Sequence, residues 1–248
     1  RGTGFVCGIA VATGKQTMYF PIHHLHDGQN HDPSETWKKL NEKLFQNPKI
    51  RKVFHNAMYD VCWIRAESKL MPKGELLDTM VAASVIDVNR MQYTLNSLSK
   101  DYLGEKKLKW DLQARSEKEF GIKDPMSNME KLPYDLVKGY AHQDVDLTLK
   151  LWNIFEKEIN KDIIVNYGYR NTKISLKKIF QLETDLFPCL VAMKFKGVRI
   201  DTEKAKIIGK DLEEKRDKLI HNIKQDTNID VKIWAATSIK KLLDQQKI

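Results

Sequence analysis

Two short clusters in the sequence contain the residue types that a metal-dependent hydrolytic site needs. The first runs Asn56-Ala57-Met58-Tyr59-Asp60 and the second runs Tyr140-Ala141-His142-Gln143-Asp144. Each places one carboxylate at a fixed distance from an aromatic or amide partner, and a hard divalent cation takes oxygen ligands from separate segments. The two clusters therefore predict two parts of a site for phosphodiester hydrolysis, with Asp60 and Asp144 as metal ligands.

The second cluster lies in a segment that the sequence predicts to be a helix beginning at Pro133. Tyr140 and Asp144 are four residues apart, so their side chains lie on one face of that helix, one turn from each other. A metal ion held by the carboxylate lowers the pKa of a bound water, and the tyrosine hydroxyl is placed to orient that water. Chance spacing or a surface pair of side chains would give the same pattern.

The first cluster follows a short expected strand at residues 52–55 and opens an expected helix. Asp60 then lies at a junction between strand and helix, where α/β sheets expose functional side chains. The Asn56 amide is suited to bind a phosphate or sugar oxygen, and the Tyr59 ring is suited to pack on a terminal nucleotide. A capping aspartate and a buried tyrosine are the structural alternative.

The rest of the first 160 residues alternates strands with helices, which indicates a layered α/β domain. We expect a hairpin of strands over residues 5–12 and 17–22, the first apolar enough to be central in a sheet. We expect a helix over residues 34–45, a strand end at 76–80 that caps the next helix, and a helix over 93–103. Residues 104–131 are polar and predict a mobile excursion.

A domain boundary is expected between residues 159 and 174, where Asn, Lys, Asp and Gly interrupt the apolar pattern. Beyond it the sequence predicts a helix carrying Phe180, Leu186 and Met193, then a turn, then a long charged helix from about Thr202 to Lys224.

Composition indicates a folded protein that works inside the cell. Of the 248 residues, 42% are hydrophobic and 30% are charged, which is typical of globular proteins. No apolar run approaches the roughly 18 residues that span a bilayer, and no signal-peptide pattern is present. The 3 cysteines are unclustered, which argues against a disulfide framework. We expect a soluble, cytoplasmic protein with no membrane partner.

The positive charge is concentrated towards the C-terminus. The formal net charge is +9, and residues 161–248 hold 19 Lys plus Arg against 12 Asp plus Glu. A basic segment suggests a polyanionic partner, because phosphate neutralisation releases counterions and favours binding. Lysine-rich helices that are simply solvated are the alternative.

In this order and spacing the two clusters resemble the proofreading exonuclease domain of family A DNA polymerases, and specifically its phage-like members. The second motif of that family matches Asn56, Tyr59 and Asp60, and the third matches Tyr140 and Asp144. The spacing is that of the tyrosine subclass, since the histidine subclass has His where this chain has Gly139.

The resemblance extends beyond the motifs and implies a domain organisation. Segments at residues 77–80, 93–98 and 102–104 are similar to the middle of that family, and residues 183–201 are similar to its connection into the polymerase. The resemblance implies a ribonuclease H-like exonuclease domain over residues 1–165, with a mixed sheet flanked by helices. It implies an all-α segment over residues 166–248, a linker helix and the beginning of the polymerase thumb.

The resemblance also implies an activity and its partners. The family removes mismatched nucleotides from a 3' end by two-metal hydrolysis with Mg²⁺ or Mn²⁺. Asp60 and Asp144 would be metal ligands, Tyr140 would orient the water, and Asn56 and Tyr59 would hold the terminal nucleotide. The partners would be a single-stranded 3' end at the exonuclease site, duplex DNA at the thumb, and the remainder of the polymerase chain.

One departure concerns the first motif of the family, an Asp-x-Glu on its first strand. Asp27, Asp32 and Glu35 do not have that spacing, so we expect a chain that begins after that strand. Such a fragment of a polymerase would be inactive by itself. Two other hypotheses stay open: an RNA-trimming exonuclease of the RNase D type, and a non-catalytic DNA-binding module.

Two further clusters contain residue types that can bind metal ions or nucleic acids. His23, His24 and His26 lie beside Asp27 and could suggest zinc, although adjacent histidines on a strand end usually diverge. The basic and aromatic group Lys106, Lys107, Lys109 and Trp110 could touch single-stranded DNA, or could be a plain surface loop.

Overall fold

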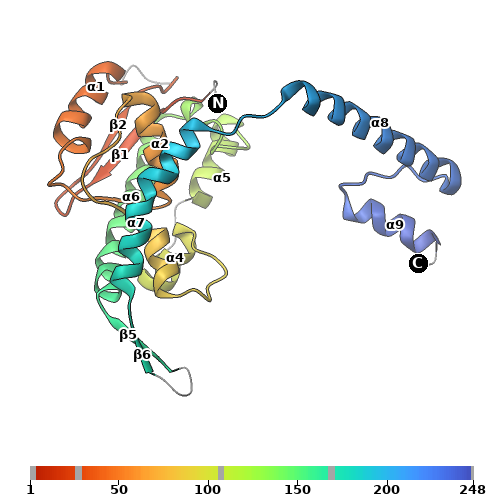
Figure 1. The fold of residues 1–248 in the computed structure, drawn as a ribbon. Helices are drawn as coiled ribbons and strands as arrows, with labels where there is room; N and C mark the ends of the chain where they lie inside the picture. The colour runs from red at the N-terminus through yellow and green to blue at the C-terminus, as the bar shows by residue number, and fades with distance from the viewer. Residues whose placement is uncertain (1–3, 26–29, 106–108, 167–170, 247–248) are drawn as a thin grey trace. The chain divides into compact units, whose positions relative to one another are not determined.

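The computed structural model describes residues 4–25, 30–105, 109–166 and 171–246 (Figure 1). The chain divides into two compact units, Arg1–Phe195 and Lys196–Ile248. The first unit combines helices with short strands, and the second is helical over its described residues. The expectation of a mixed α/β domain is therefore confirmed. The segment expected to be all-α over residues 166–248 contains a strand at residues 171–175, and only helices follow it among the described residues.

The first unit begins with an antiparallel hairpin, β1 (Gly8–Ala12) and β2 (Thr17–Pro21). Helix α1 (Pro33–Leu40) follows and continues into a π-helical turn, η1 (Asn41–Phe45). The Asp32 carboxylate begins α1 by accepting a hydrogen bond from the backbone N–H of Glu35 at 2.7 Å. The expectation of a central first strand is not met, since in the described residues β1 pairs with β2 alone.

A parallel pair of strands, β3 (Lys52–Phe54) and β4 (Leu76–Asp78), forms the second sheet. Helix α2 (Ala57–Ser68) connects the two strands, as a parallel pair requires, and α3 (Thr79–Ile86) starts directly after β4. Both helices therefore begin at the carboxyl ends of neighbouring strands, which is where the first sequence cluster lies.

The largest hydrophobic core forms where α4 (Leu95–Leu103) and α6 (Tyr134–Ile159) pack with α3. Leu98, Leu147, Leu151 and Phe155 are completely buried there. Fully burying one such side chain contributes roughly 1.5–3 kcal/mol. The long α6 is thus anchored along the part that follows its two candidate site residues.

The expected mobile excursion over residues 104–131 is wrong for most of its length. Helix α5 (Lys109–Phe120) and a 3₁₀ turn, η2 (Met129–Lys131), lie in this segment. Leu112 is buried with Leu132 and Val137 in a small cluster that holds α5 against α6. The side chains of Lys106, Lys107, Lys109 and Trp110 lie outside the described residues.

The interruption expected between residues 159 and 174 contains a ribbon of two strands, β5 (Asp162–Asn166) and β6 (Asn171–Ser175). The ribbon leads from the end of α6 to the start of α7 (Leu176–Lys196) (Figure 1). The Trp152 and Phe180 rings pack with their centroids 5.7 Å apart. Phe187 and Val191 of α7 are buried against α2 and β4.

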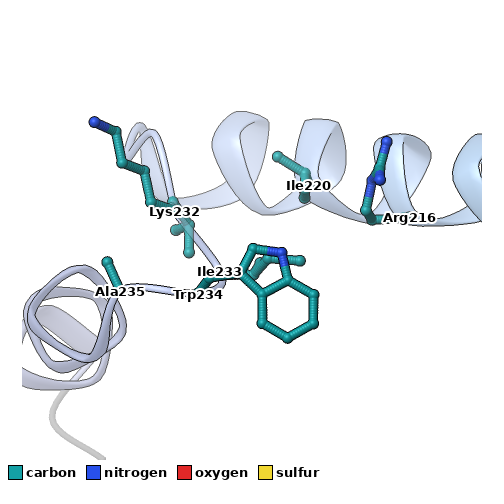
Figure 2. A pocket seen from close by; sticks show the side chains of 7 residues that line it. Arg216, Ile220, Lys232, Ile233, Trp234 and Ala235 are labelled. Carbon is teal, nitrogen blue, oxygen red and sulfur yellow. The ribbon is translucent and has the colours of Figure 1, made fainter. Parts of the chain in front are cut away.

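The second unit contains α8 (Thr202–Thr227) and α9 (Ala236–Gln246). Asp201 begins α8 by accepting a hydrogen bond from the Lys204 backbone N–H at 2.9 Å. Between the helices, Trp234 is 94% exposed beside Arg216 and Lys232 and lines a shallow hollow (Figure 2). Among the described helices of both units, each is too short or too polar to cross a membrane.

Candidate active site

The first cluster is positioned by the carboxylate of Asp78, at the end of β4. Its Oδ1 accepts a hydrogen bond from the backbone N–H of Asn56 at 3.0 Å, and its Oδ2 accepts one from Ala57 at 2.7 Å. Oδ1 also accepts a hydrogen bond from the Met80 backbone N–H at 2.8 Å. One buried side chain therefore satisfies free amides at the starts of both α2 and α3.

Asn56 adopts a left-handed backbone conformation, with φ 63° and ψ 54°. Asparagine tolerates this region better than most residues, and the hydrogen bond from its backbone to Asp78 holds it there. Its side chain makes no capping hydrogen bond to α2 and is exposed. The amide group is therefore presented to the surface at the strand-to-helix junction.

Tyr59 lies in the first turn of α2 and is 61% exposed. Its ring meets the Trp63 ring edge to face, with centroids 6.4 Å apart. The alternative of a buried structural tyrosine is therefore wrong. An exposed, supported aromatic ring is a suitable surface on which to stack a nucleotide base.

Asp60 also lies in the first turn of α2, but its side chain is turned inward. Burial, together with the nearby carboxylates of Asp78 and Asp144, raises the pKa of Asp60 to about 7. The alternative of a capping role does not apply, because Asp78 provides the capping oxygens of α2. The fold thus brings Asp60 and Asp144 close enough to interact electrostatically, although 84 residues separate them in the sequence.

Tyr140 and Asp144 lie one turn apart on α6, as their spacing predicts. The Tyr140 hydroxyl donates a hydrogen bond to the Asp144 carboxylate. Burial and then the negative charge of Asp144 raise the pKa of Tyr140, so the phenol stays protonated at neutral pH. Its one hydrogen is used in the bond to Asp144, so the hydroxyl oxygen remains available as an acceptor beside the carboxylate.

The donor set suits a hard divalent cation, because Asp60 and Asp144 are carboxylates that repel each other in a partly buried setting. A cation between them would relieve this repulsion. Asp78 is less suited, since its two oxygens already accept three backbone hydrogen bonds. In the ranges that the structure describes, His, Cys, Asp and Glu nowhere gather in a metal-binding group of three or more.

The histidine cluster does not form a zinc site among the described residues. Both ring nitrogens of His24 lie within hydrogen-bond distance of Tyr19 or Leu132, and His23 Nδ1 lies 2.9 Å from the Val6 carbonyl oxygen. The two rings therefore diverge, as expected for neighbours at a strand end. His26 and Asp27 lie outside the described residues.

Sequence reasoning anticipated Asp78 only as the cap of α3 and missed its contact with the first cluster. That contact joins residues 22 positions apart, and its signal in the sequence is an aspartate at the end of a strand expected to lie beside the first one. The position of Asp78 is what fixes Asn56 and the first turn of α2.

The elements and the paired carboxylates define a nuclease-type α/β domain, and comparison with known proteins gives its class. A family described as 3'-5' exonuclease, of the family A DNA polymerases, matches residues 1–160. The chain belongs to this family, whose members are hydrolytic enzymes that generally use divalent metal ions. The resemblance inferred from the sequence motifs is therefore confirmed.

Individual relatives are DNA polymerases. The chain is 30% identical over 215 residues to DNA polymerase DpoZ of Acinetobacter phage SH-Ab 15497, covering 85% of this chain and 32% of that protein. It is 29% identical over 205 residues to DpoZ of Salmonella phage PMBT28, covering 80% of this chain and 31% of the relative. It is 25% identical over 166 residues to DNA polymerase I of Borreliella burgdorferi, covering 67% of this chain and 16% of that protein. The chain thus spans about a third of the length of the two phage relatives.

Proposed function

We propose that the chain is the proofreading part of a DNA polymerase and removes nucleotides from single-stranded 3' ends of DNA. Its domain would be a ribonuclease H-like exonuclease over residues 1–165, and residues 166–248 would form a linker helix and the start of a thumb that contacts duplex DNA. The remainder of a polymerase chain is the expected partner. The observation that best supports this proposal is the Tyr140 hydroxyl bonded to Asp144, beside Asp60.

In this proposal Asp60 and Asp144 would hold Mg²⁺ or Mn²⁺, which would supply charge stabilisation and acidify a bound water. Tyr140, a protonated phenol that donates its hydrogen to Asp144, would accept a hydrogen bond from that water and so orient it. Asn56 presents its exposed amide to a sugar or phosphate oxygen of the terminal nucleotide. Tyr59 supplies an exposed ring against which the terminal base stacks.

No Asp-x-Glu precedes the first cluster in these 248 residues, so the test uses a polymerase chain that contains them. It measures digestion of a 5'-labelled single-stranded DNA oligonucleotide with Mg²⁺, with Mn²⁺ and with EDTA. We expect stepwise shortening from the 3' end that requires the metal and is lost in Asp144→Ala. Asp146→Ala is the matched control, because Asp146 lies on the same helix and is ion-paired to Lys150 at 2.9 Å. Unchanged digestion by Asp144→Ala would refute the assignment of the site.

A second pair of variants tests the role of the Tyr140 hydroxyl. Tyr140→Phe removes only the hydroxyl beside Asp144, and a loss of roughly 10²–10⁴-fold in rate is typical for a group that assists proton transfer. Tyr93→Phe is its control, because the Tyr93 hydroxyl donates to the Asp87 carbonyl oxygen at 2.7 Å, away from the site. An RNA oligonucleotide digested faster than DNA would favour the RNA-trimming alternative. Binding of DNA without digestion would favour the non-catalytic module.

A further inference from the structure

We propose that His24 is a positioning residue for the candidate active site. As a neutral imidazole it would join the β1–β2 hairpin to the start of α6 and so fix where α6 presents Tyr140 and Asp144. The effect of His24 on catalysis rests on the proposed function. The link between the hairpin and α6 rests on hydrogen bonds and ring contacts of described residues.

The hydrogen bonds of His24 determine its protonation pattern. The ring is almost completely buried, at 4% exposed. Its Nδ1 lies 3.2 Å from the Leu132 carbonyl oxygen, which only accepts, so Nδ1 must carry the hydrogen. In a neutral ring Nε2 is then an acceptor, and the Tyr19 hydroxyl at 2.7 Å is its donor. The carbonyl therefore sets the direction of the first hydrogen bond, and the neutral state of the ring sets that of the second.

The backbone around His24 is held on both sides. The His24 N–H donates to Asn30 Oδ1 at 2.9 Å, and Asn30 Nδ2 donates back to the His24 carbonyl oxygen at 2.7 Å. The next residue, Leu25, donates its backbone N–H to the Glu130 carbonyl oxygen at 2.8 Å. The segment after β2 thus bonds directly to the two positions, Glu130 and Leu132, that precede α6.

Tyr19 adds a second contact with the same end of α6. Its ring stacks on Tyr134, the first residue of the helix, with centroids 6.2 Å apart and planes 25° apart. Tyr19 and Tyr140 both pack against the buried cluster of Leu112, Leu132 and Val137. The hydroxyl that bonds His24 and the hydroxyl of the candidate site therefore belong to rings supported by one cluster.

Gly8 shows how closely Tyr19 is fitted into the hairpin. A Cβ at Gly8 would lie 2.1 Å from the Tyr19 hydroxyl oxygen, so a larger residue would displace the phenol. The small residue in β1 leaves the space in which Tyr19 reaches His24.

These contacts matter for the site because α6 transmits a displacement at its start. Tyr134, the first residue of α6, and Asp144 are 10 residues apart, or about 15 Å along the helix at about 1.5 Å per residue. A shift of the first turn therefore moves Tyr140 and Asp144, and a misplacement of about 1 Å in a catalytic group costs on the order of 10²-fold in rate. The effect of His24 would therefore be on the placement of these two side chains.

The first test is spectroscopic and independent of nuclease activity. Nitrogen NMR of ¹⁵N-histidine-labelled protein at neutral pH should show His24 protonated at Nδ1 and unprotonated at Nε2. Free imidazole side chains favour the opposite tautomer, so this pattern would identify the bond to Leu132. A His24 protonated at Nε2, or charged at neutral pH, would overturn the proposal.

The second test is hydrogen exchange of backbone amides in four variants. His24→Ala should speed exchange over residues 132–144 by tenfold or more while α4 is unchanged, and His24→Asn should restore protection because its amide still donates to Leu132. Tyr19→Phe, which keeps the ring, covers the case in which His24→Ala does not fold, and it should give a partial effect. His23→Ala is the matched control, since His23 is an exposed neighbour. Equal loss of protection in α4 would mean a purely structural role and would overturn the proposal.

The third test connects the link to the site. In the DNA digestion assay, His24→Ala should lower kcat by on the order of 10²-fold with KM unchanged, and His24→Asn should recover most of the rate. If the wild-type polymerase that contains these residues does not digest DNA, while the tautomer and the exchange are as expected, the proposed function is refuted and the link stays intact. An active chain whose kcat is unaffected by His24→Ala would refute the positioning role alone.

Discussion

Folding raises the pKa of the Asp60 carboxyl, and this shift makes the stability of the protein depend on pH. An aspartate in an unfolded chain has a pKa of about 3.9. In the folded chain, burial and the nearby carboxylates of Asp78 and Asp144 raise the pKa of Asp60 to about 7. The folded state therefore favours the protonated form. The stabilisation that results is fully present below the unfolded pKa and is lost as the pH rises through about 7.

Asp60→Asn should be more stable than the wild-type protein at high pH, because asparagine resembles the protonated carboxyl and cannot ionise. The gain in free energy of unfolding should be small near pH 4, grow between pH 4 and 7, and be constant above about pH 8. Urea unfolding in EDTA at several pH values measures it.

Asp146→Asn serves as the control for this series, because Asp146 forms an exposed ion pair with Lys150 and should show no rise over the same range. A difference between Asp60→Asn and wild type that does not change with pH would contradict the raised pKa. A pH dependence equal to that of the control would contradict it as well.

At the scale of elements, Asp78 joins one strand to two helices. Its hydrogen bonds to Asn56, Ala57 and Met80 satisfy free amides at the starts of α2 and α3. A single exposed cap contributes about 1 kcal/mol, and hydrogen bonds to a charged group contribute about 1.5–3 kcal/mol each. The two helices that border the candidate site therefore depend on one carboxylate.

Asp78→Ala should lower the free energy of unfolding by roughly 2–4 kcal/mol, since one buried and two partly buried amides lose their acceptor. Asp32→Ala removes the exposed cap of α1, which accepts one hydrogen bond at 2.7 Å, and should cost about 1 kcal/mol. Chemical denaturation of both variants gives the comparison. Equal losses of stability in the two variants would show that Asp78 stabilises only one of the two helices α2 and α3.

Elements with a strong local pattern were predictable from the sequence. Helix α6 follows a proline and repeats apolar residues at helical spacing, and the Tyr140–Asp144 pair depends on that spacing alone. Helix α5 was missed because few of its residues are apolar, and Leu112 finds its partners Leu132 and Val137 only in the folded chain. The β5–β6 ribbon was missed although β5 contains Ile163, Ile164 and Val165, because the Asn, Lys and Asp residues around them resemble an interruption.

The candidate site likewise combines features that the sequence predicts with features that depend on the folded chain. The two clusters predicted that Asp60 and Asp144 would lie near each other, as they do, and their motif spacing identified the family. The raised pKa of Asp60 and the anchoring of Asn56 by Asp78 arise from contacts between segments far apart in the sequence. Such contacts have no local pattern, so they become visible only when the strands and helices are placed.

At the scale of the whole molecule, the positive charge is the property that bears on DNA binding. Residues 161–248 carry 19 Lys plus Arg against 12 Asp plus Glu, and the second unit exposes Lys240 and Lys241 on α9. Each phosphate contact contributes about 0.9 to the slope of the logarithm of affinity against the logarithm of salt concentration. A thumb-like role for this unit therefore predicts a salt dependence that its lysines control.

Replacing both Lys240 and Lys241 with Ala should weaken binding to a labelled DNA duplex and reduce the salt slope by about one to two, measured by fluorescence anisotropy at several NaCl concentrations. Replacing both Lys43 and Lys49 with Ala is the matched control, because these exposed lysines of the first unit remove the same charge. If net charge alone governed binding, the two double variants would lose the same slope. A larger loss in the α9 variant would place phosphate contacts on the second unit, whereas an unchanged slope would exclude α9 from the DNA-binding surface.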